Sequence, residues 1–251
     1  MAQTVAAREK GLSGNALKII AVLSMVIDHI GASIIEQGIF HRPDAEAVQA
    51  VLSTDIGLKW FFADRVLRTV GRLAFPIMAF LLVEGYLHTR DFKKYAERMF
   101  LFALISEIPF DLAFYGTWFA PRHQNVFFTL FIGLLVLEGY SRFQFSQTKQ
   151  QLIMLAGCAI ALLLRCDYDA TGIILILVMY IFHENKKYMT LMGALIAGIG
   201  SSSNFFAAAL AFIPIYMYNG TRGRMKLKYF FYLFYPVHLL VLYAARVLIF
   251  S

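Results

Sequence analysis

Nine apolar segments follow one another along this chain and leave only short polar stretches between them. Of its 251 residues, 59% are hydrophobic and 16% are charged, whereas soluble domains carry about 25% charged residues. The segments are residues 16–37, 66–88, 97–116, 124–141, 150–165, 170–183, 188–200, 203–219 and 228–250. Such runs are typical of membrane-spanning helices. The sequence therefore predicts an all-α polytopic membrane helix bundle with about nine transmembrane helices, in a single domain of residues 1–251.

Basic residues gather around the start of the first segment and in every second loop after it. They are Arg8, Lys10 and Lys18, then Arg90, Lys93, Lys94 and Arg98, then Arg142 and Lys149, then Lys186 and Lys187, then Arg222, Arg224, Lys226 and Lys228. Because lysine and arginine favour cytoplasmic loops, this alternation places the N-terminus in the cytoplasm. The first apolar run is also too long for the core of a cleavable signal peptide.

Several function classes do not fit this composition. The net charge of +7 is explained by basic cytoplasmic loops, and no basic and aromatic platform for nucleic acid lies outside the apolar runs. Cys158 and Cys166 are too few for a disulfide framework and are expected to be packing residues. No metal-ligand spacing is present. The stretch from Gly38 to Val66 looks amphipathic and is expected to lie along a membrane interface.

The first apolar segment carries ionisable residues along one face. Lys18 and His29 are eleven positions apart, which is about three helical turns, or roughly 16 Å. Glu36 falls near the same stripe. Because ionisable groups are costly at membrane depth, this stripe indicates a functional site with His29 as a candidate general base. Asp28 either orients the imidazole or bonds elsewhere, and the alternative for His29 is a packing role between helices.

Arginines mark the start of the second segment. Arg65, Arg68 and Arg72 have the spacing of one helix face and suit an anionic or carbonyl partner. The alternative is structural pairing with Glu107 and Asp111, which are one turn apart on the third segment.

The last segment carries Tyr235, His238 and Arg246 within one broad face. Buried tyrosine and histidine need partners, so this face is expected to meet a polar cavity. The alternative is that Tyr235 and His238 bond neighbouring helices while Arg246 extends to the outer interface. Loop residues expected on the same side as His29, where they are either solvated or part of a site, are Arg122, His123, Asn125, Arg165, Asp167 and Asp169.

Five stretches, spread over nearly the whole chain, resemble those of a known protein family. They are LKIIAVLSMVIDHIG (17–31), GRLAFPIMAFLLVEGYLHT (71–89), FALISEIPFDLAF (102–114), NVFFTLFIGLL (125–135) and KYFFYLFYPVHLLVL (228–242). Taken in this order, they resemble the TraX family of bacterial inner-membrane proteins, named for the pilin N-acetylase of conjugative plasmids.

TraX proteins are similar in turn to wider groups of membrane acetyltransferases. One group O-acetylates bacterial surface glycans and is marked by an arginine and a histidine eleven positions apart on the first helix. Here Lys18 stands in place of that arginine and His29 matches the histidine. The heparan-alpha-glucosaminide N-acetyltransferases form another group, and their Phe-Pro-x-x-x-Phe pattern resembles Phe75, Pro76 and Phe80.

The resemblance implies an inner-membrane acetyltransferase that moves an acetyl group from cytoplasmic acetyl-CoA to an envelope acceptor, either a pilin N-terminus or a glycan amine or hydroxyl. His29 is the expected base, Asp28 its orienting partner and Arg72 a stabiliser of the oxyanion or acceptor. Residues expected at acetyl-CoA are Lys18, Tyr235 and His238. Those expected at the acceptor are Arg68, Glu107, Asp111 and Asn125. No metal is expected, and the extended pantetheine arm is about as long as the separation of Lys18 and His29.

Two other functions stay open at this point. The same buried charges would suit a small-solute or ion transporter, although no paired inverted halves are visible in the sequence. A non-catalytic assembly factor for an envelope structure is the second alternative. The acceptor and the oligomeric state are not determined by the sequence.

Overall fold

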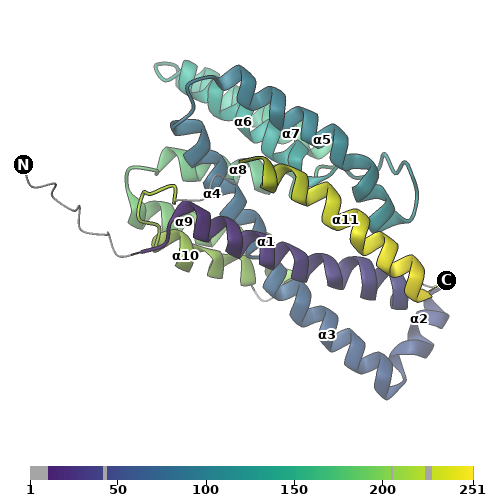
Figure 1. The fold of residues 1–251 in the computed structure, drawn as a ribbon. Coiled ribbons are helices and arrows are strands. Elements are labelled where there is room, and N and C mark those ends of the chain that lie inside the picture. The colour runs from purple at the N-terminus through teal and green to yellow at the C-terminus, as the bar shows by residue number, and fades with distance from the viewer. Residues whose placement is uncertain (1–10, 42–43, 205, 224–227, 251) are drawn as a thin grey trace, which may run out of the picture.

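Helices make up nearly all of the computed structural model, which describes residues 11–41, 44–204, 206–223 and 228–250 (Figure 1). They are α1 (Gly14–Ile30), η1 (Gly31–Phe40), α2 (Ala45–Leu52), α3 (Asp55–Gly71), α4 (Ala74–Leu87), α5 (Phe92–Tyr115), α6 (Val126–Arg142), α7 (Gln147–Leu163), α8 (Asp169–Ile181), α9 (Lys186–Gly200), η2 (Ser202–Asn204), η3 (Ala207–Ala211), α10 (Phe212–Tyr216) and α11 (Lys228–Phe250). Each predicted apolar segment contains helix, and no strand is formed within these ranges. The predicted all-α class is confirmed.

Three of the described helical stretches are long and apolar enough to cross a membrane. They are Gly14–Phe40, Asp55–Leu87 and Phe230–Phe250. Shorter apolar helices include Asp169–Ile181 and Ala207–Tyr216. The architecture is that of a helical membrane bundle, and the count of nine crossings stays a prediction.

The first membrane-length stretch changes helix type part of the way along. The side chain of Ser13 accepts a hydrogen bond from the Ala16 backbone at 3.3 Å and so begins α1. From Gly31 to Phe40 the helix is a π-helix, η1. Such wide turns are rare and are found frequently at functional sites. Here the change begins two residues after His29.

α3 packs very closely against α1, and glycine permits this approach. A Cβ added at Gly71 would lie 2.2 Å from both Cβ and Oδ1 of Asp28. On the other helix, a Cβ added at Gly31 would lie 2.9 Å from Oδ1 of Asp64. The missing side chains therefore bring the charged residues of α1 and α3 within bonding distance of one another.

The boundary expected at Val66 is absent. Thr54 accepts a hydrogen bond from the Gly57 backbone at 2.9 Å and begins α3, which runs to Gly71 and is followed, after a turn at Arg72, by α4. The predicted amphipathic segment therefore ends inside a helix. Arg68 and Arg65 lie within this helix, and their side chains have partners in α1 and in η2.

The expected segment 203–219 is also divided, into η2, η3 and α10. Phe206 lies between the first two with a positive φ of 58°. The Ser201 hydroxyl accepts a hydrogen bond from the Ala208 backbone at 3.1 Å, which folds the chain back after α9. The segment 203–219, expected to form one of about nine transmembrane helices, is therefore made of three short helices.

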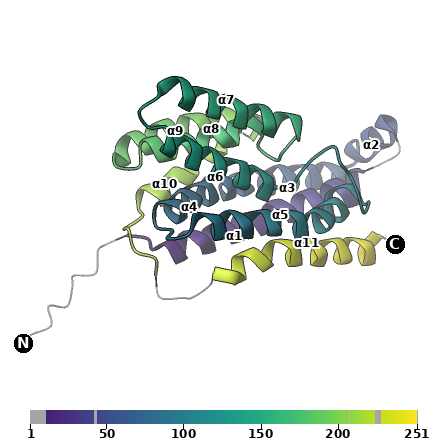
Figure 2. The ribbon, with the colours of Figure 1, turned by 90° about the horizontal axis from the view of Figure 1, so that it is seen from above.

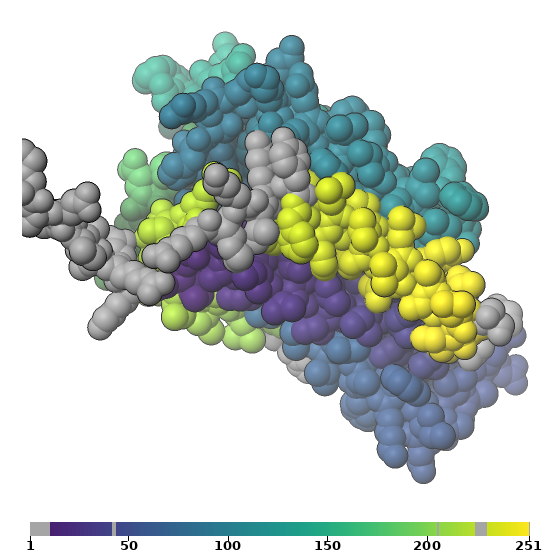
Figure 3. Space-filling view, in the orientation of Figure 1, coloured from purple at the N-terminus to yellow at the C-terminus, as the bar shows by residue number. Residues whose placement is uncertain are grey.

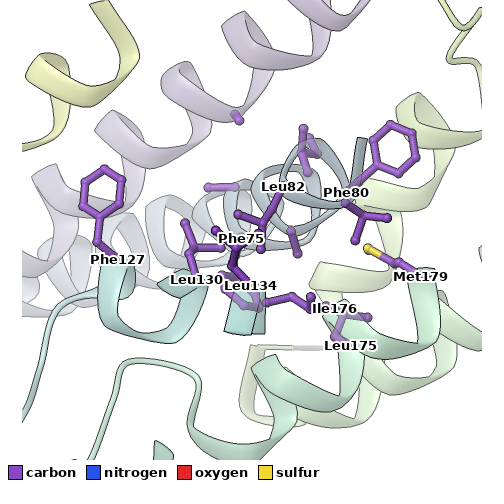
Figure 4. Close-up of a cluster of buried hydrophobic side chains, with 14 of the residues drawn as sticks. Phe75, Phe80, Leu82, Phe127, Leu130, Leu134, Leu175, Ile176 and Met179 are labelled. Carbon is purple, nitrogen blue, oxygen red and sulfur yellow. The ribbon is translucent and has the colours of Figure 1, made fainter. Parts of the chain in front are cut away.

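A buried apolar cluster joins α4, α6 and α8 at the centre of the bundle (Figure 4). Phe75, Leu134 and Ile176 are each less than 4% exposed. Seen from above, α11 lies along one side of the molecule and α7 along the other, with α4 and α6 between them (Figure 2). α11 and α1 form adjoining strips across one face (Figure 3).

The outward faces of the helices are apolar as well. On α5, Leu101, Leu104 and Ile108 are 52%, 50% and 49% exposed. A surface of this kind is a liability in water, but it is the expected surface of a helix that faces lipid.

We expect Gly71→Ala to lower the free energy of unfolding by about 2 kcal/mol, because the added methyl group overlaps Asp28. The matched control is Gly198→Ala in α9, where the new Cβ would meet Ala209 Cβ at an ordinary 3.5 Å. That control should be neutral or slightly stabilising. Thermal unfolding of the purified variants in detergent measures both effects. Equal melting temperatures for the two variants would contradict the close α1–α3 contact.

Candidate functional site

His29 lines a cavity of about 300 Å³, called here the His29 cavity. Its walls come from α1, η1, α3, α4, α5, α6, α11 and the loop between α7 and α8. The polar residues of this lining are Asp28, His29, Glu36, Gln37, Arg68, Arg72, Tyr115, Asp167, Tyr168 and Tyr235. Asp28, His29, Arg68, Arg72 and Tyr235 were expected as site residues, and the fold brings them together here.

The His29 ring is held by α11. Its Nδ1 lies 2.7 Å from Nε2 of His238, and the two rings are nearly parallel, with an interplanar angle of 7°. The other ring nitrogen of His238, Nδ1, lies 2.8 Å from the backbone oxygen of Phe234. Edges of Phe114 and Tyr235 pack against His29 with ring centroids 5.1 and 6.0 Å away. The imidazole thus has a fixed orientation at the cavity wall.

Asp28 has a different partner from the one first expected. Arg68 donates from Nη1 to Oδ2 of Asp28 at 2.5 Å and contacts Oε1 of Glu36 through Nε at 3.1 Å. The alternative that Asp28 bonds away from His29 is therefore the one found. Arg68 pairs with these two carboxylates and not with Glu107 or Asp111, because α3 packs on α1 and not on α5.

Arg72 ends α3 and lines the same cavity. Its Nε is buried and has no hydrogen-bond partner within the described ranges. A guanidinium in this situation is suited to an anionic or carbonyl oxygen of a ligand. Arg65, one turn before Arg68, donates instead to the backbone oxygen of Ser203.

The loop between α7 and α8 contributes two further residues: Asp167, which was expected only as one of several loop charges, and Tyr168, which was not expected at the site. Asp167 and Tyr168 both line the His29 cavity. Loss of surrounding water raises the pKa of the Asp167 carboxyl to about 6, and nearby Arg72 opposes this rise. Tyr168 stacks on Phe75 with ring centroids 3.7 Å apart. Consecutive polar residues in a short loop between apolar segments were the only signal in the sequence.

Three predicted acceptor residues, Glu107, Asp111 and Asn125, lie outside the lining of the His29 cavity, and Glu107 and Asn125 bond to each other. Asn125 begins α6 by accepting from the Phe127 backbone at 3.0 Å. Its side-chain nitrogen donates to Glu107 and also to the Ala103 oxygen at 2.8 Å. Asp111 accepts from the Ala120 backbone at 2.8 Å. These contacts fix the loop between α5 and α6, and a direct contact with an acceptor stays a prediction.

Arg246 does not extend to the outer interface. It is 8% exposed and donates to the backbone oxygens of Leu112 and Ala113 at 2.8 and 2.7 Å. Carbonyls in the last turn of a helix have no partner within that helix. Arg246 therefore caps α5 and fastens α11 to it.

Lys18 lines a second cavity, of about 460 Å³, called here the Lys18 cavity. Its basic residues are Lys18, His88, Arg98 and Arg222, and its tyrosines are Tyr95, Tyr218 and Tyr232. The Lys18 ammonium lies 5.2 Å from the centre of the Phe231 ring. Arg98 has a buried Nε with no hydrogen-bond partner in the part of the chain that the structure describes.

The two cavities adjoin. Met78, Phe127, Leu130 and Phe231 line both of them. The Lys18 cavity opens among the start of α1, the loop between α4 and α5 and the segment before α11, whereas the His29 cavity lies towards η1 and the loop between α7 and α8. Lys18 and His29, which both belong to α1, thus line two adjoining cavities. No group of three histidine, cysteine or acidic residues in the described ranges is placed to hold a metal.

Helices of membrane-spanning length and outward apolar faces define this chain as a helical membrane protein. Its family follows from comparison with known proteins. The sequence profile described as TraX protein matches residues 13–246, so the chain belongs to the TraX family.

A curated relative extends this comparison. The chain is 29% identical over 255 residues to the "Probable fimbrial assembly protein FimC, serogroup H1" of Dichelobacter nodosus, covering 92% of this chain and 94% of that protein. No solved structure gives a significant match.

Proposed function

We propose that this chain is an acetyltransferase of the bacterial inner membrane that moves an acetyl group from cytoplasmic acetyl-CoA to an amine or hydroxyl of an envelope acceptor. One observation supports this above all others: two adjoining cavities, one lined by basic residues and the other by His29. Acetyl-CoA has a phosphorylated head and a long arm that ends in a thioester. The head suits the Lys18 cavity and the thioester suits the His29 cavity.

The Lys18 cavity is suited to the phosphates of acetyl-CoA. Lys18, Arg98 and Arg222 line it, and the unpartnered Nε of Arg98 is an unused donor. Arginine binds phosphate oxygens through two parallel hydrogen bonds, and lysine acts as a compact charge. Because the loops at this end are basic, the positive-inside rule assigns them to the cytoplasm, where acetyl-CoA is made available.

The arm of the donor then extends towards His29. An α-helix rises about 1.5 Å per residue, so the eleven positions between Lys18 and His29 span roughly 16 Å. This is comparable with an extended pantetheine arm. The shared wall residues, including Phe127 and Leu130, are apolar and would exclude water from the thioester.

In the His29 cavity, at the end of the acetyl-CoA arm away from the cytoplasm, His29 acts as the general base. The acceptor nitrogen or oxygen attacks the thioester carbonyl carbon while His29 takes its proton. A new C–N or C–O bond forms, the C–S bond breaks, and the thiolate recovers the proton to leave as the free thiol of CoA. Arg72 is positioned to stabilise the negative charge on the carbonyl oxygen, and Tyr235 lines the chamber in which the acetyl group is transferred.

The acceptor belongs to the envelope. Family membership and the printed name of the fimbrial relative favour a pilin, and a glycan is the other acceptor class. Asp167 gives the His29 cavity an acidic group, which suits an ammonium group before it loses its proton. Arg68 is paired with Asp28 and Glu36. In this proposal it keeps these side chains in fixed positions on the wall of the His29 cavity where the acceptor binds.

A second candidate is a non-catalytic fimbrial assembly factor. The observation that favours it is the similarity to the Dichelobacter nodosus protein, which is named a probable fimbrial assembly protein. In that case the polar cavities would bind a partner without thioester turnover. The two candidates differ in whether acetyl-CoA binds, and this can be measured without knowing the acceptor.

We expect wild-type protein to bind labelled acetyl-CoA in equilibrium dialysis, and Lys18→Met and Arg98→Met each to raise its Kd about tenfold. The reason is that each variant loses a hydrogen bond between a charged group and phosphate. Lys149→Met is the matched control, because Lys149 lies over Phe143 and lines neither cavity. Absence of acetyl-CoA binding, or equal Kd values in all variants, would contradict the proposed donor site.

A further inference from the structure

We propose that His238 is a positioning residue that holds His29 in the tautomer with its proton on Nδ1, so that Nε2 of His29 is the atom that receives the acceptor's proton. The assignment of a reaction to Nε2 rests on the proposed function. The tautomer itself follows from hydrogen bonds between α1 and α11, and it can be tested separately.

The tautomers follow from a chain of three groups. A backbone carbonyl oxygen only accepts hydrogen bonds, so the contact of 2.8 Å between Phe234 O and Nδ1 of His238 places a proton on that nitrogen. A neutral imidazole carries one ring N–H, which makes Nε2 of His238 an acceptor. Nδ1 of His29, 2.7 Å from it, must then donate. The remaining nitrogen of His29, Nε2, has a free lone pair.

The neutral state of both rings is consistent with their surroundings. His238 is 8% exposed, and Arg68 and Arg72 line the cavity beside His29. A further positive charge on either ring would be poorly solvated and close to like charges. Asp28 and Glu36 do not reverse this, because both carboxylates are engaged by Arg68.

Packing keeps the ring pair in place. Phe234 stacks on His238 with ring centroids 4.9 Å apart, while Phe114 and Tyr235 press edge-on against His29. The two histidines are 209 positions apart in the chain. The last helix therefore supplies the orienting acceptor that a carboxylate supplies in many histidine-dependent sites.

This arrangement has a consequence for proton transfer. When Nε2 of His29 takes a proton, its Nδ1–H stays hydrogen-bonded to His238, and the new charge is shared with a polarisable neutral ring. Without His238, the His29 ring would be free to carry its proton on Nε2, and the lone pair would then point away from the acceptor.

Long-range ¹H–¹⁵N correlation spectra of protein labelled with ¹⁵N-histidine report which ring nitrogen carries the proton. The chain has six histidines, and the His29 signals are assigned by their loss in His29→Gln. We expect wild-type His29 to be protonated on Nδ1 and unprotonated on Nε2. A wild-type His29 protonated on Nε2, or on both nitrogens, would overturn the inference.

Two variants of His238 separate the acceptor from the bulk of the ring. His238→Gln places an amide oxygen near the former Nε2 and should preserve the His29 tautomer. His238→Asn is too short to do so and should move the proton to Nε2. We expect kcat for acetyl transfer to fall about 10- to 100-fold in His238→Asn, with the KM for acetyl-CoA unchanged and largely restored activity in His238→Gln.

The spectra and the kinetics distinguish this inference from the proposed function. The predicted tautomers in a protein that transfers no acetyl group would uphold the role of His238 and contradict the acetyltransferase. Acetyl transfer with an unchanged His29 tautomer in His238→Asn would uphold the enzyme and overturn the role of His238.

Discussion

Replacing His29 with alanine should lower acetyl transfer by about 10²- to 10⁴-fold, the range over which a general base contributes. Binding of acetyl-CoA should persist, because the basic groups of the Lys18 cavity are untouched. His29→Gln should show the same loss, since an amide of similar size cannot take up the proton. The measurement is incorporation of labelled acetyl groups into envelope fractions by membranes that contain each variant.

His183→Ala is the matched histidine control. His183 lies after α8, with Nδ1 2.6 Å from the Tyr180 oxygen, and lines neither cavity. Its replacement should leave transfer unchanged. Full transfer by His29→Ala membranes would exclude His29 as the base, and an equal loss in both variants would indicate a general effect on folding.

The second large effect concerns stability. Arg68→Met should lower the free energy of unfolding by about 3 kcal/mol, because it leaves the carboxylates of Asp28 and Glu36 without their cation in a confined site. Arg68 and Asp28 side chains are only 19% and 16% exposed. Thermal unfolding in detergent or nanodiscs gives the loss as a lowered melting temperature.

A surface pair supplies the comparison for this prediction. Lys93 and Glu97 are 3.9 Å apart and their side chains are 87% and 59% exposed, so Lys93→Met should change stability by less than about 0.5 kcal/mol. Adding Asp28→Asn to Arg68→Met should recover part of the loss, because it removes one of the two unpaired charges. Equal melting temperatures for Arg68→Met and Lys93→Met would show that the Asp28–Arg68–Glu36 contacts do not stabilise the bundle.

The positions of the helices were largely predictable, because apolar composition alone marks a segment that must satisfy its backbone internally. Two boundaries were not. Val66 lies inside α3. Whether the arginines of α3 interrupt a helix depends on partners in α1 that the local sequence does not reveal. The division of 203–219 depends on the Ser201 hydroxyl, which bonds a backbone group seven residues away.

The site was predictable in part. Lys18 and His29 were expected on one stripe, and they line adjoining cavities, because both lie within the regular α-helix before the change at Gly31. Glu36 lies beyond that change, where π-helical geometry alters the angle between successive residues. Its pairing with Arg68 depends on the tertiary approach of α3.

Long-range partners were the main gap. Each candidate on the last helix was recognised as needing a partner, but the identity of that partner depends on how α11 packs. His238 meets His29, and Arg246 caps α5, only because α11 lies beside both α1 and α5. Asp167 was treated as one of several loop charges, since no local pattern shows that its loop folds over Phe75.

Mass spectrometry of envelope proteins and glycans is the most direct test of acetyl transfer by this chain. Cells with the wild-type chain, cells without it and cells with His29→Ala would be compared for acetyl groups on pilin N-termini and surface glycans. We expect an acetyl group that is lost without the chain, restored by wild type and absent with His29→Ala. Identical acetylation in all three, together with defective fimbriae in cells without the chain, would contradict this expectation and favour a non-catalytic assembly factor.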